Sequence, residues 1–293
     1  YKYNIMKSSI IIPSCKNHDY LKLCIESIDK NSTFNHEIIV HINGIDHITE
    51  NLLSIKNLKY TKSDVNIGLC SGVNMAVQKS STNYIVYAHD DMYFLPRWDV
   101  ALSDEIKKID HNLFYLSATQ ISSNLPGKDL DNHIYFDAGH DLLSFKENKL
   151  LNNFMKLNFY NLQGSHWAPH IIHKKIWNKV GGFSQEFDPG FASDPDLNMK
   201  LWNEGVRIFK GVNLSRIYHF GSITTRKNIN ISKNEGNRTF LLKWGFSKNF
   251  FIKHYLRRGE IHKGPLKLNP QKNIFYFFDL LISKIKFVIE KLR

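Results

Sequence analysis

Short apolar runs alternate with helix-like segments over about the first 90 residues. The runs are rich in β-branched residues and nearly continuous, which is typical of strands buried on both faces. The predicted strands are Ser8–Pro13, Glu37–Ile42, a weak Leu58–Thr61 and Tyr84–His89, and the predicted helices between them are Tyr20–Lys30 and Ser71–Lys79. This alternation predicts an α/β protein built on a βαβ-type parallel sheet.

The pattern is more mixed beyond this point. Residues 97–110 predict a helix, Leu113–Thr119 predicts a strand, and residues 134–160 suggest short antiparallel strands. The later predicted elements are helices at Ile171–Val180 and Pro195–Glu204, the latter with Gly205 at its C-cap, and strands at Val206–Phe209 and Ser215–His219.

Residues 274–293 form a predicted helix with one polar stripe. The stripe recurs at spacings of four and three residues and comprises Asp279, Ser283, Lys286, Glu290 and Arg293. Lys284 and Lys286 lie in the middle of the segment. In a bilayer-spanning helix their charges would lie inside the bilayer, which has a high free-energy cost. The pattern therefore favours an interfacial helix on anionic lipid, with packing on the protein or in a dimer as the alternative.

Composition and charge divide the chain unevenly. Its 293 residues, 42% hydrophobic, suit one large α/β domain with an appendage or two small domains. Residues 1–220 hold 23 Lys and Arg against 23 Asp and Glu, whereas residues 221–293 hold 16 against 4 and so carry the whole net charge of +12. A neutral body with a basic tail argues against a nucleic-acid enzyme and for an anionic partner of the tail. Three cysteines without zinc spacing or a disulfide framework indicate a reducing compartment.

Asp90 and Asp91 end the strand at Tyr84–His89. Ligands bind outside the carboxyl ends of strands in open α/β sheets, where carboxylates can hold a divalent cation that neutralises a diphosphate. The alternative is a solvated Asp-Asp turn.

Two further clusters carry candidate chemistry. Residues 64–74 form a glycine-bearing turn that runs into a helix, which suits a phosphate or is an ordinary loop. At the later helix, Ser193 is predicted as N-cap and Asp196 near N3, while Asp194 faces the cleft as a general base. His219 ends a strand and is a candidate metal ligand or a structural histidine.

The ordered series of motifs resembles family 2 glycosyltransferases with the GT-A fold. The matching segments, which cover about residues 8–222, are SSIIIPSCKN, EIIVHING, DVNIGLCSGVNMA, YIVYAHDD, GGFSQEF, SDPDLNMKLW and YHFGS. The resemblance implies a Rossmann-like, mostly parallel sheet in a catalytic domain over residues 1–222, with a donor half at about 1–110 and an acceptor half at about 111–222. A basic, aromatic, helical extension follows over 223–293.

The resemblance also implies an activity. It is an inverting transfer of a sugar from a nucleotide sugar, with a UDP-sugar favoured, to a hydroxyl of a glycan or lipid-linked acceptor, assisted by Mn²⁺ or Mg²⁺. The implied place of action is the cytoplasm, at the inner face of the cell membrane.

Residue roles follow from the matched positions. Asp91 and His219 match metal ligands, Asp194 matches the base with Asp196 as second candidate, and His89 replaces a frequent Asp and receives no role. The implied donor-binding residues are Pro13, Ser14, Asn43, Asn66, Gly68 and Asp90. The segment at 164–170 borders the acceptor, so Trp167 could stack on a sugar and His166 and His170 could bind hydroxyls, unless Trp167 is core and the histidines are surface residues.

Two positions depart from the family pattern. Ile42-Asn43 stands where an Asp usually meets the base, although Asn43 could still hydrogen-bond uracil. Ser193-Asp194 replaces a Glu-Asp pair, which leaves Asp194 as the better base. The alternatives to this activity are a nucleotidyltransferase, for which SSIIIPSCKN lacks the expected glycines, and a non-enzymatic nucleic-acid-binding protein, which only the tail supports.

Overall fold

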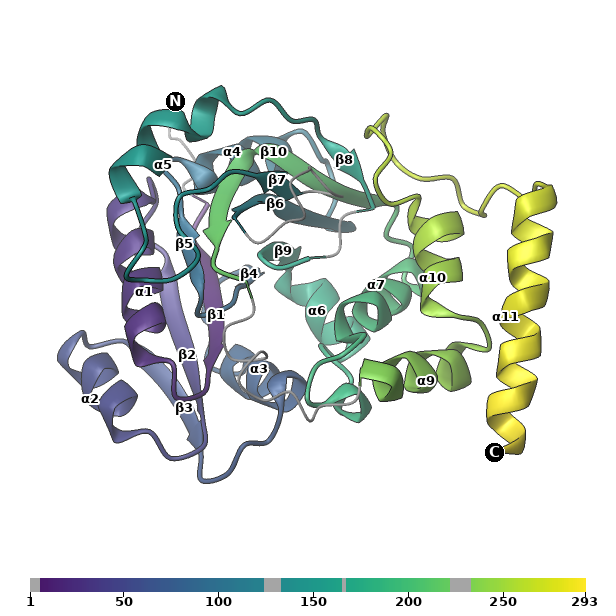
Figure 1. The fold of residues 1–293 in the computed structure, drawn as a ribbon, viewed down its shortest axis with the longest axis horizontal. Coiled ribbons are helices and arrows are strands. Elements are labelled where there is room, and N and C mark those ends of the chain that lie inside the picture. Colours follow the sequence, from purple (N-terminus) through teal and green to yellow (C-terminus); the bar gives the residue numbers. More distant parts are fainter. Residues whose placement is uncertain (1–5, 124–132, 165–166, 222–232) are drawn as a thin grey trace.

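A single mixed sheet forms the centre of the protein (Figure 1). The computed structural model describes residues 6–123, 133–164, 167–221 and 233–293. The strands are β1 (Ser8–Ser14), β2 (Glu37–Asn43), β3 (Lys59–Ser63), β4 (Tyr84–Tyr87), β5 (Met92–Phe94), β6 (Phe114–Ser122), β7 (His133–Tyr135), β8 (Leu162–Gln163), β9 (His170–His173) and β10 (Ile208–His219).

Helices flank this sheet. They are α1 (His18–Asn31), α2 (His47–Ile55), α3 (Leu69–Val77), α4 (Trp98–Lys107), α5 (Glu147–Asn153), α6 (Lys174–Val180), α7 (Ser193–Asn203), α9 (Lys233–Trp244), α10 (Lys248–Phe250) and α11 (Ile274–Leu292). Short 3₁₀ turns lie at Phe154–Lys156 and Gln185–Phe187, and a π-helix lies at Phe251–Leu256.

The strand order is β3-β2-β1-β4-β9-β6-β10-β5, with β7 beside β6 and β8 beside β10. Strands β1 to β4 pair in parallel, as do β6 and β10. Strand β9 runs antiparallel to both β4 and β6, and β5 runs antiparallel to β10. The predicted α/β class with a mostly parallel sheet is therefore confirmed.

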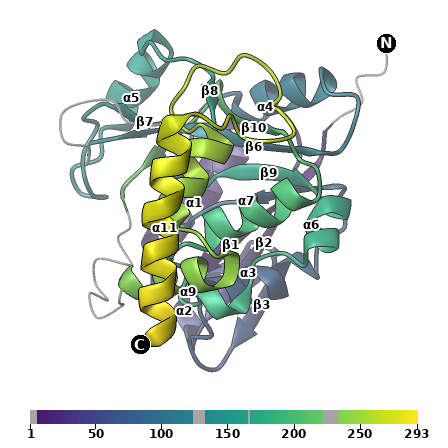
Figure 2. The same ribbon diagram turned by 90° about the vertical axis from the view of Figure 1, so that its right-hand side faces the viewer.

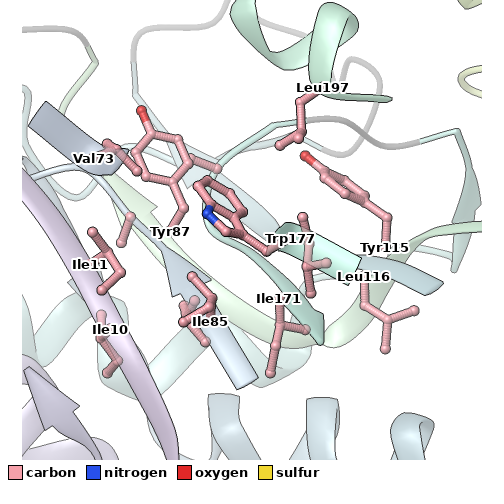
Figure 3. Close-up of a cluster of buried hydrophobic side chains, with 14 of the residues drawn as sticks. Ile10, Ile11, Val73, Ile85, Tyr87, Tyr115, Leu116, Ile171, Trp177 and Leu197 are labelled. Carbon is pink, nitrogen blue, oxygen red and sulfur yellow. The ribbon is translucent and has the colours of Figure 1, made fainter. Parts of the chain in front are cut away.

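Burial on both faces explains the continuous apolar runs in the sequence. Ile10, Ile11 and Ile12 of β1 are all fully buried, so both faces of this strand are covered, and its buried Ser8 and Ser9 hydroxyls are hydrogen-bonded. Figure 3 shows the side chains that fill the core between the sheet and α3, α6 and α7; those labelled are Ile10, Ile11, Val73, Ile85, Tyr87, Tyr115, Leu116, Ile171, Trp177 and Leu197.

Several predicted elements differ from the observed ones. The segment predicted as helix Ile171–Val180 begins instead as strand β9, and α6 starts only at Lys174. Residues 134–160 hold the short β7 and the helix α5 rather than antiparallel strands, because their aromatic side chains pack into a second core cluster with Tyr218 and Phe220. The two short strands predicted after Gly205 form one strand, β10, with a bulge between Val212 and Arg216.

The C-terminal region falls into two parts. Phe240, Phe251 and Leu256 are fully buried in the main core, so α9 and the π-helix pack directly against the central sheet and its helices. Helix α11, which confirms the predicted helical tail, lies along the outside of α9 and α10 (Figures 1 and 2). Among the described residues, none of the helices combines the length and the hydropathy needed to cross a bilayer.

Candidate active site

Strand pairing brings Asp91 and His219 together across 128 residues. Strand β10 pairs with β5 so that His219 is opposite Met92, and the amide of Phe220 donates to the Asp91 carbonyl at 3.1 Å. As a result His219 Nε2 lies 3.1 Å from Asp91 Oδ1. Asp91 is only 3% exposed. The two residues predicted as metal ligands therefore meet at the carboxyl end of β4.

Hydrogen bonds determine the tautomer of the His219 ring, that is, which of its two nitrogens carries the proton. The Gln120 amide nitrogen donates to the Ala168 carbonyl, so the Gln120 oxygen is the atom 2.9 Å from His219 Nδ1. An amide oxygen only accepts, so Nδ1 must carry the proton. In the neutral ring, Nε2 and a carboxylate oxygen then face each other as two acceptors. A cation between them satisfies both, which is how outer hydrogen bonds commonly orient metal-binding histidines.

His89 is the third member of this group. One ligand atom from each of His89, Asp91 and His219 lies within 4.8 Å of the others. Burial lowers the pKa of His89 to about 4, so its ring is neutral and able to bind a metal, and the Tyr87 hydroxyl holds its Nε2 at 3.0 Å. The residues fit a divalent cation, and two imidazoles with one carboxylate suit Mn²⁺ better than Mg²⁺, which prefers oxygen ligands. The sequence did not reveal this role, because His89 occupies a position where an acid is usual.

Asp90 points away from this group. Its Oδ2 accepts a 2.7 Å hydrogen bond from the Ser14 hydroxyl at the end of β1. Burial, and then the neighbouring Asp91 carboxylate, raise the pKa of Asp90 to about 7. Asp90 and Ser14 thus lie together where β1 and β4 end. Pro13 is the residue before Ser14 on β1.

Asn43 shapes the predicted donor loop. Its side-chain oxygen accepts from the Ile67 amide at 2.7 Å and its nitrogen donates to the Gly68 carbonyl at 3.0 Å. The Asn66 oxygen accepts from the Gly68 amide at 2.9 Å. Asn43 therefore ties the end of β2 to the loop before α3, and its amide is already engaged by that loop.

The N-terminus of α3 is occupied by a side chain of the protein itself. The Asp188 carboxylate accepts from the Cys70 amide at 2.7 Å, from the Ser71 amide at 3.2 Å and from the Ser71 hydroxyl at 2.6 Å. The phosphate expected there from the glycine-bearing turn is thus replaced by an internal anion. Gly68 has φ of +87°, and a Cβ on it would lie 2.2 Å from Asp188 Oδ1. No local signal pointed to Asp188, which is 117–118 residues away from its partners.

Asp194 lies in the first turn of α7, on a pocket of about 880 Å³. His89 and Trp167 line the same pocket. The Asp194 side chain keeps some exposure, yet its Oδ1 is buried and has no hydrogen-bond partner in the described part of the chain. Burial raises the pKa of Asp194 to about 7. An unpaired buried oxygen disfavours the charged carboxylate, so Asp194, which lines the pocket, is suited to take up a proton near neutral pH.

Asp196 is engaged elsewhere. It is fully buried, and it accepts from Trp244 Nε1 at 2.9 Å and from the Ser184 hydroxyl at 2.6 Å. Lys243 lies 2.9 Å from the same carboxylate. Asp196 therefore anchors α9 to α7, and the geometry favours Asp194 over Asp196 as base. Ser193 is not the expected N-cap, because α7 begins at Ser193 itself and its hydroxyl donates to the Gly190 carbonyl.

The predicted acceptor residues separate into different environments. Trp167 lines the pocket, with the Arg258 guanidinium 5.6 Å from the centre of its ring. His170 is only 1% exposed on β9, where its Nδ1 lies 2.8 Å from the Tyr115 hydroxyl. It supports the pocket from the core and does not reach its surface, contrary to the expected hydroxyl-binding role. His166 lies outside the described residues.

The sequence model of glycosyl transferase family 2 matches residues 9–177. The chain belongs to this family. The resemblance found in the motifs is thereby confirmed, and the protein is a glycosyltransferase rather than a nucleotidyltransferase or a nucleic-acid-binding protein. No curated protein matches the sequence significantly.

Solved glycosyltransferase structures share the fold. TarS from S. aureus, residues 1–349, matches with a TM-score of 0.54 and 13% identity, and the match covers 84% of this chain and 72% of TarS 1–349. The complex of TarS 1–349 with UDP matches with a TM-score of 0.53 and 12% identity, and that match covers 85% of this chain and 75% of the TarS chain. The mannosyltransferase PcManGT from Pyrobaculum calidifontis, in complex with GDP-Man and Mn²⁺, matches with a TM-score of 0.51 at 12% identity over 73% of this chain and 56% of that one. These matches confirm the GT-A architecture.

Proposed function

We propose that this glycosyltransferase moves a sugar from a nucleoside-diphosphate sugar, with a UDP-sugar favoured, to a hydroxyl of a glycan or lipid-linked acceptor, with inversion at the anomeric carbon. The observation that carries the proposal is one pocket lined both by His89 of the His-Asp-His group and by Asp194, whose partly buried carboxylate can take a proton. The complexes of related folds with UDP, UDP-GlcNAc and GDP-Man support the class of donor.

His89, Asp91 and His219 would hold a divalent cation, Mn²⁺ or Mg²⁺, with Mn²⁺ favoured by the two imidazoles. When bound, the cation would supply charge neutralisation for the departing nucleoside diphosphate. Gln120 keeps the His219 ring in the metal-binding tautomer, and Tyr87 holds His89. Asp90 and Ser14 would bind the donor beside this group.

Asp194 would act as the general base in a single in-line displacement. As the acceptor hydroxyl oxygen forms a bond to the anomeric carbon, the bond from that carbon to the diphosphate oxygen breaks, and the hydroxyl proton passes to Asp194. A carboxylate with a pKa of about 7 is well matched to proton abstraction near neutral pH. Inversion follows because attack and departure occur on opposite sides of the carbon.

The test is a panel of UDP, GDP and dTDP sugars assayed with Mn²⁺, first for binding by thermal shift and then for transfer. Asp194→Asn should lower turnover roughly 10²–10⁴-fold while leaving donor binding nearly intact. Asp110→Asn, which alters an exposed carboxylate outside both the pocket and the proposed donor loop, is the matched control. Near-wild-type transfer by Asp194→Asn would exclude it as the base, and failure of all three nucleotide classes to bind would exclude the donor assignment.

We further propose that the enzyme is peripheral on an anionic membrane surface, at the inner face of the cell membrane, through α11. Three members of the polar stripe of α11, Asp279, Ser283 and Glu290, contact the protein, whereas Lys286 and Arg293 are exposed. Asp279 lies 2.7 Å from Lys253, Glu290 lies 3.1 Å from Arg238, and the buried Ser283 hydroxyl accepts from the Ser247 amide. This packing leaves the apolar side of α11 outward.

The outward side of α11 is exposed over its whole length. Ile274 is 78% exposed, Leu281 59%, Ile285 52% and Leu292 83%. At helical spacing, four basic residues flank this face, with Lys284 and Lys291 along one edge and Lys286 and Arg293 along the other. An apolar face between lysines whose ammonium groups can reach the headgroups is the arrangement that binds anionic bilayers.

Vesicle flotation tests this attachment with the full chain. Wild type should float with phosphatidylcholine vesicles that contain phosphatidylserine, and less with pure phosphatidylcholine, because the flanking lysines add an electrostatic contribution. Leu281→Asp with Ile285→Asp should abolish flotation without unfolding the protein, since both side chains are exposed. Concentration-dependent dimers with no vesicle binding would instead assign this face to a second copy.

A further inference from the structure

A groove separates part of α11 from the helices α9 and α10, which it lies beside in Figure 1. Its volume is about 470 Å³, which is in the size range of small-molecule sites. Four of its lining residues are basic, namely Arg238, Lys248, Lys286 and Arg293, and Glu290 is the one acidic residue among the described residues that line it. Neither the proposed cation group nor the base accounts for this charge.

Glu290 is shared between the two arginines of the groove. Its Oε2 lies 3.1 Å from Arg238 Nε, and its Oε1 lies 3.0 Å from the Arg293 guanidinium. Both carboxylate oxygens are therefore engaged, and one negative charge serves two positive ones. A guanidinium has five N–H donors, so both arginines keep donors for a further acceptor.

The two lysines of the groove have no such partner. In the part of the chain that the structure describes, no carboxylate lies within ion-pair distance of Lys248 or Lys286. Lys248 directly follows Ser247, whose amide donates to the Ser283 hydroxyl of α11. Lys286 lies about one helical turn after Ser283 on the same side of α11. Both lysines therefore border the groove near the point where α10 contacts α11.

The groove combines this positive charge with apolar surface. Leu241, which is buried, and Ile289, which is 47% exposed, line it beside the basic residues. Lys286 and Arg293 also flank the exposed apolar face of α11, so the groove opens along one edge of the face that is proposed to meet the membrane. A lipid with an anionic headgroup matches both properties, because its phosphate offsets the repulsion among the cations and its apolar part meets the apolar residues.

We propose that this groove binds the phosphate headgroup of a single membrane lipid, with Lys248 and Lys286 as the principal contacts of the phosphate. The site goes beyond the proposed attachment of α11, which requires only the surface of a bilayer, and it rests on that attachment for the choice of a lipid. Lys248 and Asn249 line both the groove and the pocket that contains Asp194. A headgroup held in the groove is therefore next to the pocket in which sugar transfer is proposed.

Binding of dihexanoyl phosphatidic acid, a short-chain lipid used below its micelle concentration, tests the groove in the full chain by isothermal titration calorimetry. Lys286→Gln should weaken binding about tenfold or more, because a charge-assisted hydrogen bond to the phosphate is lost. Lys248→Gln should show a similar loss, and Lys286→Arg should keep most of the affinity. Lys284→Gln, which removes an exposed lysine of the same helix outside the groove, should bind as the wild type does. Thermal unfolding of each variant establishes that it is folded.

The binding measurement is independent of the proposed function. Leu281→Asp with Ile285→Asp, which should abolish flotation on vesicles, changes two residues outside the groove and should leave binding of the short-chain lipid intact. Because no turnover is measured, loss of lipid binding by Lys286→Gln does not affect the assignment of Asp194.

Two further ligands identify the chemistry of the site. Dihexanoyl phosphatidylcholine, whose headgroup has no net charge, and inorganic phosphate, which has no apolar part, should each bind at least about tenfold more weakly than phosphatidic acid. Wild type that does not bind phosphatidic acid, or a folded Lys286→Gln variant that binds it as tightly as Lys284→Gln does, overturns the proposal. Inorganic phosphate that binds as tightly as the lipid overturns the assignment to a lipid.

Discussion

Asp194→Asn should stabilise the fold while it abolishes catalysis, and the stabilisation should depend on pH. Burial raises the pKa of Asp194 to about 7, against about 3.9 for an aspartate in an unfolded chain. The folded state therefore binds a proton more tightly than the unfolded state does. Ionisation of this carboxyl opposes folding, so its cost is absent below about pH 4 and complete above about pH 7.

The magnitude follows from the difference between the two pKa values. Each pH unit between them contributes about 1.4 kcal/mol, so the wild type should lose about 1.5 kcal/mol at pH 5 and about 4 kcal/mol at pH 8. Asp194 keeps some exposure at the pocket, and solvent screening makes these figures upper bounds. The protonated acid and the amide have nearly the same shape. The difference between pH 5 and pH 8, about 2.5 kcal/mol at most, therefore isolates the ionisation.

Urea unfolding of metal-free protein at pH 5 and pH 8 measures this difference for wild type, Asp194→Asn and the control Asp110→Asn. The stabilisation by Asp194→Asn should be larger at pH 8, and the control should show no such change. A free-energy difference between Asp194→Asn and wild type that is equal at the two pH values would refute the reasoning, because Asp194 would then ionise as it does in water. The same result would remove the argument that this carboxylate is adapted to accept a proton near pH 7.

Three further variants probe the surroundings of the site. Gln120→Leu should weaken Mn²⁺ affinity about 10–100-fold in calorimetry, because His219 Nδ1 loses its acceptor; unchanged affinity would show that the tautomer is held in another way. Asp188→Ala should lower the free energy of unfolding by about 0.5–2 kcal/mol through loss of the α3 cap. Gly68→Ala should lower it by about 1–3 kcal/mol in urea, and by more than Gly181→Ala, since both glycines have positive φ but only a Cβ at Gly68 would meet a neighbour; equal losses would contradict the clash.

Long-range pairing decided most of what the sequence could not predict about the fold. Strands β1, β2 and β4 were predictable because a strand buried on both faces is mostly apolar and lacks the alternation of a half-exposed strand. Strand β9 could not be recognised in this way, because its four residues, His170–His173, include only two apolar side chains, run directly into α6 and are too few to show a period that separates a strand from the first turn of a helix. Its place between β4 and β6 depends on partners far away in sequence.

The candidate site divides in a similar way. The position of Asp90 and Asp91 at a strand end could be inferred from the chain alone, and the motif series added His219 and Asp194. Only the folded chain shows that His89 lies with Asp91 and His219 in the candidate metal site and that Asp188 fills the end of α3. The contacts of Asp188 join residues more than 100 positions apart, and no local pattern records them.

The clearest contrast between sequence and tertiary structure is in α11. The spacing of its polar residues by itself determined a helix with one polar stripe and a broad apolar side. Which side packs on the protein was decided by the partners that the fold offers. Lys253, Arg238 and the Ser247 amide provide charged and hydrogen-bonding partners at the places where the stripe passes. Asp279, Ser283 and Glu290 of the stripe are therefore turned inward, and the apolar side is left for an environment outside the chain.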